Sequence, residues 1–165
     1  MPRAGALSSI PVRTHPPTET MTPKLRPACP EDSAFVYRVK KASLGEYIHL
    51  TWGWDEELQQ ALHAKRFDPA AIQIISCGRT DVGWVEVDRR HHDLRLAGIY
   101  ILPDHQGWGT GTAVIHGLLA EASVGQRAVT LQVLKVNRRA RMLYERLGFV
   151  TTGESATHYH MSLRP

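Results

Sequence analysis

The chain has 165 residues, of which 42% are hydrophobic and 22% charged, the size and composition of one soluble globular domain. Its net charge of +4 suits a polyanionic small ligand, whereas no basic cluster interleaved with aromatic residues indicates nucleic acid. No apolar run approaches the roughly 20 residues of a membrane helix, and the two cysteines have no metal-type spacing. We therefore expect a cytoplasmic protein with neither a nucleic-acid nor a membrane partner.

The first 22 residues have no sustained hydrophobic periodicity. They carry Pro2, Pro11, Pro16 and Pro17 among serine, threonine and alanine, which predicts a flexible N-terminal extension over residues 1–22 and a single domain over 23–165. Two alternatives stay open: translation that starts at Met21, and an export signal in which Arg3 precedes a mildly apolar patch.

The first predicted elements are a short strand at Lys24–Arg26 and a helix opened by Pro30. Gly45 is expected to loosen or end that helix. Asp55 is a suitable N-cap for a second helix, which continues to about Arg66 with acidic residues in its first turn.

Three aromatic residues, Tyr47, Trp52 and Trp54, lie close together between these helices. One interpretation is that they pack the second helix onto a sheet, as buried aromatic side chains usually do. The other is that they line a small-molecule pocket, in which Glu46, Asp55 or Glu56 attracts a cationic amine. The two interpretations are compatible, because a pocket needs packed walls.

A hairpin follows, with strands at Ile72–Cys77 and Val82–Asp88. On a period of two, Glu86 shares one face with Trp84 and Asp88. Solvent exposure on one face of an antiparallel sheet is the ordinary explanation for such a carboxylate. A catalytic or substrate-binding role is the alternative.

The most informative stretch is an apolar strand over residues 96–102, a glycine-studded turn over Gln106–Thr112, and a helix that continues to Ala122. Such a turn directs backbone N–H groups and a helix N-terminus at an anionic phosphate. A nucleotide-triphosphate loop is disfavoured because the turn has no lysine, and a dinucleotide loop because its glycines alternate singly.

The C-terminal part predicts a strand over residues 129–134, a helix capped by Asn137 with Gly148 at its exit, and closing strands at Phe149–Gly153 and His158–Leu163. Strand–helix–strand around the glycine turn makes one parallel pair. The predicted fold class is α+β, with a mixed, mostly antiparallel sheet of about seven strands and helices on both faces.

Two motifs resemble the GNAT superfamily, the Gcn5-related N-acetyltransferases. The first is Gln106-x-x-Gly109-x-Gly111 after a strand that ends in Ile-x-Pro. The second runs from Asn137 through Ala140, Leu143 and Tyr144 to Leu147-Gly148-Phe149. The resemblance extends over about Leu25 to Leu163.

The resemblance implies acetyl-CoA as co-substrate and assigns residues to it. Ile99 and Ile101 would pair through their main chain with the pantetheine arm, Asn137 would touch the same arm, and Tyr144 would protonate the leaving thiolate. The backbone of the turn would cradle the pyrophosphate, with Gln106, Gly107, Trp108, Gly109, Thr110, Gly111 and Thr112 as the residues concerned. Tyr144 as a plain core residue is the alternative.

The general base is not carried over from the family. Several relatives place a carboxylate on the central strand where this chain has Arg95. Glu86, acting through a water, is therefore the first candidate, with His158 or His160 behind it. No third ligand has a fixed spacing to these histidines, so no metal is expected.

The arginines of the last helix (Arg138, Arg139, Arg141 and Arg146) form a solvated face in the simplest interpretation, and contact coenzyme A phosphates in the alternative. We expect direct attack by a small-molecule primary amine in a ternary complex, with Tyr47, Trp52 and Trp54 as acceptor-binding residues. Acetylation of peptide or protein N-termini and a non-catalytic acyl-CoA sensor are the alternatives, and a homodimer is possible.

Overall fold

The computed structural model describes residues 22–165, so all of the predicted N-terminal extension except Thr22 lies outside the described residues. The strands are β1 (Lys24–Pro27), β2 (Ile72–Cys77), β3 (Thr80–Arg89), β4 (Asp93–Ile101), β5 (Ala128–Leu134), β6 (Val150–Glu154) and β7 (His158–Leu163). The α-helices are α1 (Ser33–Trp52), α2 (Glu56–Arg66), α3 (Thr110–Val124) and α4 (Arg138–Arg146). The order of strands and helices is the predicted one.

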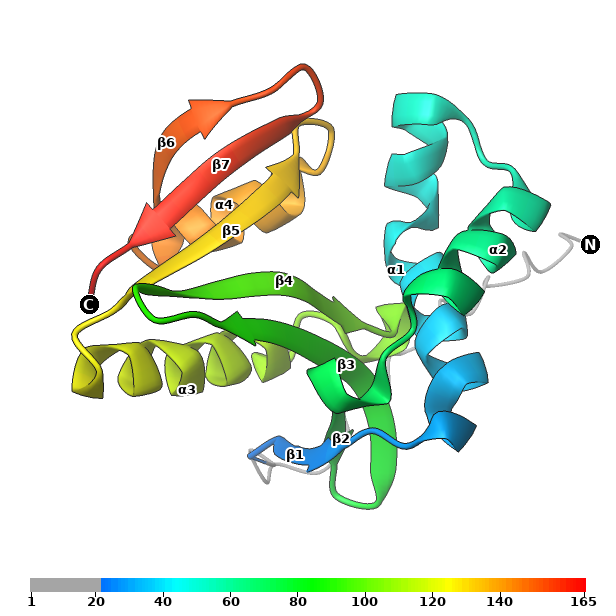
Figure 1. The fold of residues 1–165 in the computed structure, drawn as a ribbon, viewed down its shortest axis with the longest axis horizontal. Coiled ribbons are helices and arrows are strands. Elements are labelled where there is room, and N and C mark those ends of the chain that lie inside the picture. Colours follow the sequence, from blue (N-terminus) through cyan, green and yellow to red (C-terminus); the bar gives the residue numbers. More distant parts are fainter. Residues whose placement is uncertain (1–21) are drawn as a thin grey trace, which may run out of the picture.

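All seven strands form one sheet in the order β1-β2-β3-β4-β5-β7-β6 (Figure 1). Among the strands of residues 22–165, only β4 and β5 pair in parallel, and every other neighbouring pair is antiparallel. This confirms the predicted α+β class and the mixed, mostly antiparallel sheet.

Helices cover both faces of the sheet because the strands alternate apolar side chains between two cores. On one face Val36 and Val39 of α1 pack with Trp84 of β3, whose indole N–H donates to the carbonyl of Val36 at 3.0 Å. On the other face α3 and α4 pack against the central strands, with Ile115 and Leu94 fully buried between them. Glu86 follows Trp84 on the α1 face, as its spacing predicts.

The prediction that Gly45 ends or loosens the first helix is wrong. Helix α1 continues to Trp52 and ends at Gly53, whose φ of +82° few residues other than glycine adopt. Gly45 serves packing instead: a Cβ at this position would lie 3.4 Å from the ring of Trp54. The predicted cap of α2 is confirmed, since the Asp55 side chain accepts from the backbone N–H of Leu58 at 2.9 Å.

The strands β4 and β5 diverge, and we call the V-shaped opening between them, seen in Figure 1, the wedge. The two strands pair only from Asp93 to Leu96 on β4, so residues 97–101 have no partner on that side. A register shift between Glu86 and Val87 marks the same level of β3. Helix α1 lies across the open side of the wedge.

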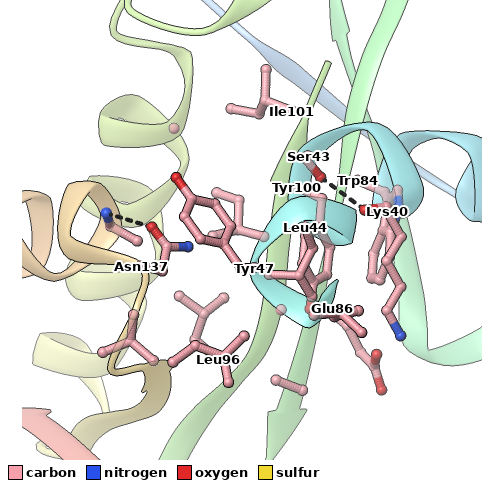
Figure 2. A pocket seen from close by; sticks show the side chains of 18 of the residues that line it. Lys40, Ser43, Leu44, Tyr47, Trp84, Glu86, Leu96, Tyr100, Ile101 and Asn137 are labelled. Carbon is pink, nitrogen blue, oxygen red and sulfur yellow. Dashed lines mark hydrogen bonds between the residues drawn. The ribbon is translucent and has the colours of Figure 1, made fainter. Parts of the chain in front are cut away.

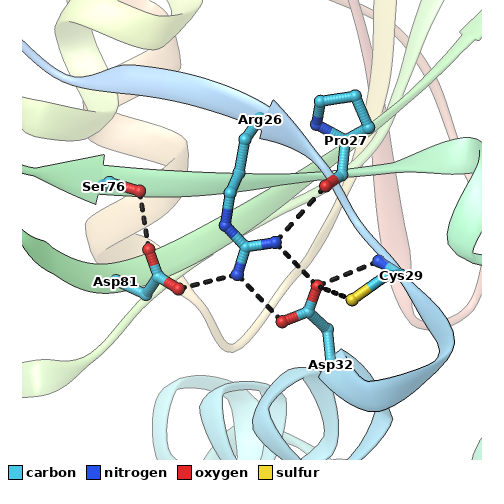
Figure 3. Close-up of polar contacts among 6 residues, drawn as sticks. All are labelled: Arg26, Pro27, Cys29, Asp32, Ser76 and Asp81. Carbon is cyan, nitrogen blue, oxygen red and sulfur yellow. Dashed lines mark hydrogen bonds and ion pairs between the residues drawn. The ribbon is translucent and has the colours of Figure 1, made fainter.

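A three-way ionic contact holds β1 against the rest of the domain (Figure 3). The Arg26 guanidinium donates to both oxygens of Asp32, at 2.8 and 2.9 Å, and to Asp81 in the β2–β3 hairpin at 2.7 Å. Asp81 also accepts from the Ser76 hydroxyl at 2.6 Å. Hydrogen bonds from Arg26 hold the pKa of Asp32 well below its usual range.

Candidate active site

A cavity of about 1310 Å³ fills the wedge. Its walls come from α1, α2, β3, β4, the glycine turn, the start of α3, β5, α4 and the start of β7. It brings together Glu86 of β3, Tyr144 of α4 and Asn137 at the N-cap of α4. This volume exceeds that of an ordinary drug-sized pocket, so it has room for a long ligand beside a second molecule.

The backbone of β4 is open toward this cavity. The N–H of Leu102 donates to the carbonyl of Val82 at 2.8 Å, so alternate residues turn their polar groups toward β3, and Ile99 and Ile101 turn theirs away from it. Because β5 pairs no further than Leu96, this edge faces the wedge. The Ile101 carbonyl is already engaged: it accepts from the Gln106 side chain at 2.8 Å.

The glycine turn and the first turn of α3 line the cavity with their backbone. Gly107 and Gly109 have φ of +84° and +82°, values at which a Cβ would be strained, and Gly109 is the N-cap of α3. The helix begins at Thr110, within the predicted turn, so the residues from Thr110 to Thr112 form its first turn and have donors with no intrahelical acceptor. This is a suitable cradle for a diphosphate, and nothing lies within 4 Å of a Cβ built on Gly109. Trp108 is 54% exposed.

Asn137 and Gln106 connect α4 to this turn. The Asn137 oxygen accepts from the backbone N–H of Ala140 at 3.0 Å, which confirms the predicted N-cap. Its amide nitrogen is thereby turned toward the cavity (Figure 2). The Gln106 oxygen accepts from Arg139 at 2.9 Å, so one side chain ties the end of β4 to α4.

Tyr144 lies in the wall formed by α4, packed against the ring of Phe149 at a centroid distance of 5.7 Å. It is 8% exposed. Burial raises the pKa of its hydroxyl well above the usual range, so the group stays protonated at neutral pH and can donate a hydrogen bond.

Glu86 lines the cavity where β3 faces α1. Burial raises the pKa of its carboxyl, while Lys40 and Arg95 act in the opposite direction and Asp68 and Asp88 reinforce the rise. A raised pKa makes a carboxylate a stronger base, which is the property that a general base near neutral pH needs.

The three predicted acceptor-binding aromatics all line the cavity. Tyr47 points from α1 toward the side of the cavity where Asn137 lies (Figure 2). Trp52 ends α1 and lies against the ring of His158 at 6.0 Å, whereas the indole of Trp54 donates to Glu56 at 2.8 Å and packs on Gly45. Packing and pocket lining therefore coexist here.

The carboxylates that were expected to attract an amine are otherwise engaged or lie elsewhere. Asp55 caps α2. Glu56 accepts from Lys41, Trp54 and Tyr37, contacts that lower its pKa to about 2. Glu46 is exposed, and neither it nor Glu56 lines the cavity.

His158 also lines the cavity, and burial lowers its pKa, which leaves the ring neutral and able to accept a proton. His160 is its neighbour along β7 and does not line the cavity. Within residues 22–165 no three His, Cys, Asp or Glu side chains gather as a metal site would require.

Sequence reasoning did not assign three cationic residues of the cavity to the site: Lys40, Arg66 and Arg95. Lys40 had a detectable signal, because positions 40, 43, 44 and 47 share one face of α1 and all four line the cavity. The other two depend on how α2 and β4 meet, which no local pattern encodes.

Of the other arginines of α4, Arg146 lines the cavity, whereas Arg141 pairs with Glu145 and lies over the ring of Tyr159 on the outer surface. In the described part of the chain no helix is both long and apolar enough to cross a bilayer.

Comparison with known proteins agrees with this geometry. Residues 70–151 match the model of the acetyltransferase (GNAT) domain family. An uncharacterized N-acetyltransferase of Mycobacterium tuberculosis is 37% identical over 62 residues, which are 37% of this chain and 40% of that protein. The match thus spans about two fifths of that relative.

Solved structures extend the likeness to most of the chain. An acetyltransferase from Thermus thermophilus has a TM-score of 0.69 at 21% identity, over 88% of this chain and 99% of its own. The PaiA N-acetyltransferase of Thermoplasma acidophilum, solved in complex with coenzyme A, has a TM-score of 0.70 at 14% identity, over 88% and 100%. With the family model, the split sheet and the glycine turn in agreement, this chain belongs to the GNAT superfamily.

Proposed function

We propose that this protein is an N-acetyltransferase that moves the acetyl group of acetyl-CoA to the primary amine of a small molecule, by direct attack in a ternary complex. The observation that carries the proposal is the coincidence of three features in one cavity: the open edge of β4, the N–H groups of the glycine turn, and Tyr144.

The residues present fit coenzyme A. The first turn of α3 and the backbone of Gly107 and Gly109 would hold the pyrophosphate. The open backbone of Ile99, the N–H of Ile101 and the amide nitrogen of Asn137 would hold the pantetheine arm. Because Gln106 already occupies the Ile101 carbonyl, the part we assign to Gln106 is to fix the end of β4 and not to bind the ligand through its side chain.

The amine must lose a proton before it attacks, because an alkyl ammonium has a pKa near 10. Glu86 takes this proton through a water, and its raised pKa suits the task. The nitrogen then forms a bond to the acetyl carbon, and a backbone N–H of β4 near Ile99 donates to the resulting oxyanion.

Collapse of that oxyanion breaks the carbon–sulfur bond. The nitrogen gives up its second proton and the thiolate gains one, so the products are an amide, a thiol and one proton released through Glu86. Tyr144 donates a hydrogen bond to the thiolate as it forms, and burial keeps its hydroxyl protonated for this role.

A small acceptor is favoured over a protein surface because Tyr47, Trp52 and Trp54 line the cavity beside α1. The position of His158 next to Trp52 makes it the second candidate for the base.

Thiol release from acetyl-CoA, measured with a panel of small amines and confirmed by mass spectrometry of the product, tests the proposal. We expect turnover that falls about 10²–10⁴-fold in Glu86→Gln, the usual value of a general base. Tyr144→Phe should lower kcat without a matching rise in the KM of acetyl-CoA.

Arg90→Gln is the matched surface control, since Arg90 pairs with Asp88 outside the cavity. Acetyl-CoA binding without turnover on any amine would favour the sensor alternative. Turnover on peptides alone would favour the N-terminal acetyltransferase alternative. Wild-type rates in both active-site variants would refute the roles assigned here.

A further inference from the structure

The charges that line the cavity are unbalanced toward the positive. Five lysine or arginine side chains line it, against two carboxylates, Asp55 and Glu86. Asp55 is committed to the cap of α2, so Glu86 is the only lining carboxylate free to meet a ligand among residues 22–165. An acceptor that was purely cationic would meet a repulsive field here.

Three of the cations, Lys40, Arg66 and Arg95, belong to the part of the cavity that contains Glu86. They come from α1, the end of α2 and β4. Electrostatic interactions join Lys40 to Glu86 and Arg66, and join Arg95 to Glu86. Lys40 and Glu86 extend from neighbouring elements into the same region in Figure 2.

None of these three cations has a salt bridge or a side-chain hydrogen bond within residues 22–165. The nearby carboxylates are engaged elsewhere: Asp68 caps a turn through Ala70, and Asp88 pairs with Arg90. Lys40 is largely removed from solvent, and burial lowers its pKa. A partly buried ammonium group without an anion is costly unless a ligand supplies one.

We propose that the acceptor is an amine that also carries an acidic group, a carboxylate or a phosphate. Lys40, Arg66 and Arg95 bind the anion while Glu86 receives the ammonium. This inference rests on the proposed function, because it names the substrate class of the same site. One carboxylate beside three cations offers a group of opposite sign to each charged group of such an acceptor.

Matched pairs of amines that differ only in the acidic group test this. Phenylalanine is compared with phenylalaninamide and glycine with glycinamide for the carboxylate, and phosphoethanolamine with ethanolamine for the phosphate. We expect kcat/KM, measured by thiol release, to favour the acidic member of at least one pair by about tenfold or more, which corresponds to about 1.4 kcal/mol.

Charge-removing variants identify the residues responsible. Lys40→Gln and Arg95→Gln should each lower about tenfold the ratio of kcat/KM for the acidic member to kcat/KM for the neutral member. The ratio is the readout because both cations also act on the pKa of Glu86, which changes the rate with either member. Lys65→Gln is the matched control, because Lys65 precedes Arg66 on α2 and does not line the cavity. Circular dichroism checks that each variant is folded.

Calorimetry with the same pairs and no acetyl-CoA separates this inference from the proposed function. Binding of the acidic member that Lys40→Gln weakens, without turnover, would refute catalysis and support the anion subsite. Turnover with a preference for neutral amines or polyamines would support catalysis and overturn the subsite. No difference within any pair, in either assay, would also overturn it.

Discussion

Asn137 is expected to have two separable roles, one in the stability of α4 and one in binding the coenzyme arm. Its oxygen caps a helix of nine residues, and its nitrogen faces the cavity. Asn137→Ala removes both groups, whereas Asn137→Asp keeps an oxygen to accept from Ala140 and removes the amide N–H.

The expected stability loss follows from the cap. An N-cap replaced by alanine costs about 1 kcal/mol, which lowers the Tm of a domain of this size by about 2–4 °C. Asn137→Asp should keep the wild-type Tm, because a carboxylate is also favoured at a helix N-terminus. Differential scanning fluorimetry without ligand measures both values.

The expected binding loss follows from the amide nitrogen. One neutral hydrogen bond contributes about 0.5–1.5 kcal/mol, so the Kd of acetyl-CoA should rise about 2- to 12-fold in Asn137→Ala and at least as much in Asn137→Asp. Equal Tm losses in the two variants would refute the capping argument. A wild-type Kd in Asn137→Asp would refute the contact with the pantetheine arm.

Three further predictions concern Glu86, Gly98 and Asp32. Since a base must be deprotonated, kcat/KM should rise with pH through the pKa of Glu86, which burial places above its ordinary value. Glu86→Gln should abolish this rise on the acidic side of the pH profile. A rise that persists in the variant would point to another base, His158 first. In Gly98→Ala the new Cβ would lie 2.4 Å from the Tyr100 ring, so that ring must leave its position against Trp84. We therefore expect the free energy of unfolding, measured with urea, to fall by about 1–3 kcal/mol. Wild-type stability would show that the ring moves freely. The pKa of Asp32 is lower in the folded protein than in the unfolded chain, where it is near 3.9. The stability that this difference contributes is present above the unfolded pKa and is lost as pH falls toward the folded value. Asp32→Asn should therefore reduce the fall in the free energy of unfolding at acid pH, and an unchanged fall would contradict the Arg26 contact.

Much of the fold could be predicted because local rules and tertiary structure agree in this chain. Pro30, Asp55 and Asn137 act at helix starts, and Gly148, with φ of +97°, follows α4. Alternating apolar residues identify the strands at Ile72–Cys77 and in β5. Each of these signals depends on a residue and its neighbours in sequence, so a single chain is sufficient to see it.

Gly45 shows where local rules fail. A glycine in a helix costs about 1 kcal/mol relative to alanine and often marks an end, yet α1 continues through it. The reason is a contact with Trp54, nine positions along the chain, whose ring needs the space that a side chain would fill. No pattern inside the helix reveals that need.

The residues of the glycine turn, the aromatic stretch and Tyr144 could be chosen from sequence because motifs mark them, and their roles stay predictions. Lys40, Arg66 and Arg95 could not be assembled into one group, because 55 positions separate the first from the last. They meet only where α1 and α2 lie over the split between β4 and β5.

The amino-acid sequence by itself determined the order of strands and helices, the helix caps and the glycine turn, because periodicity, capping and positive φ are properties of short segments. Only the tertiary structure decided that β4 and β5 separate after Leu96, that Gln106 occupies the Ile101 carbonyl, and that Lys40 and Arg95 lie near Glu86. These features depend on the burial of charge and on strand pairing between distant segments, which come into contact only when the chain is folded.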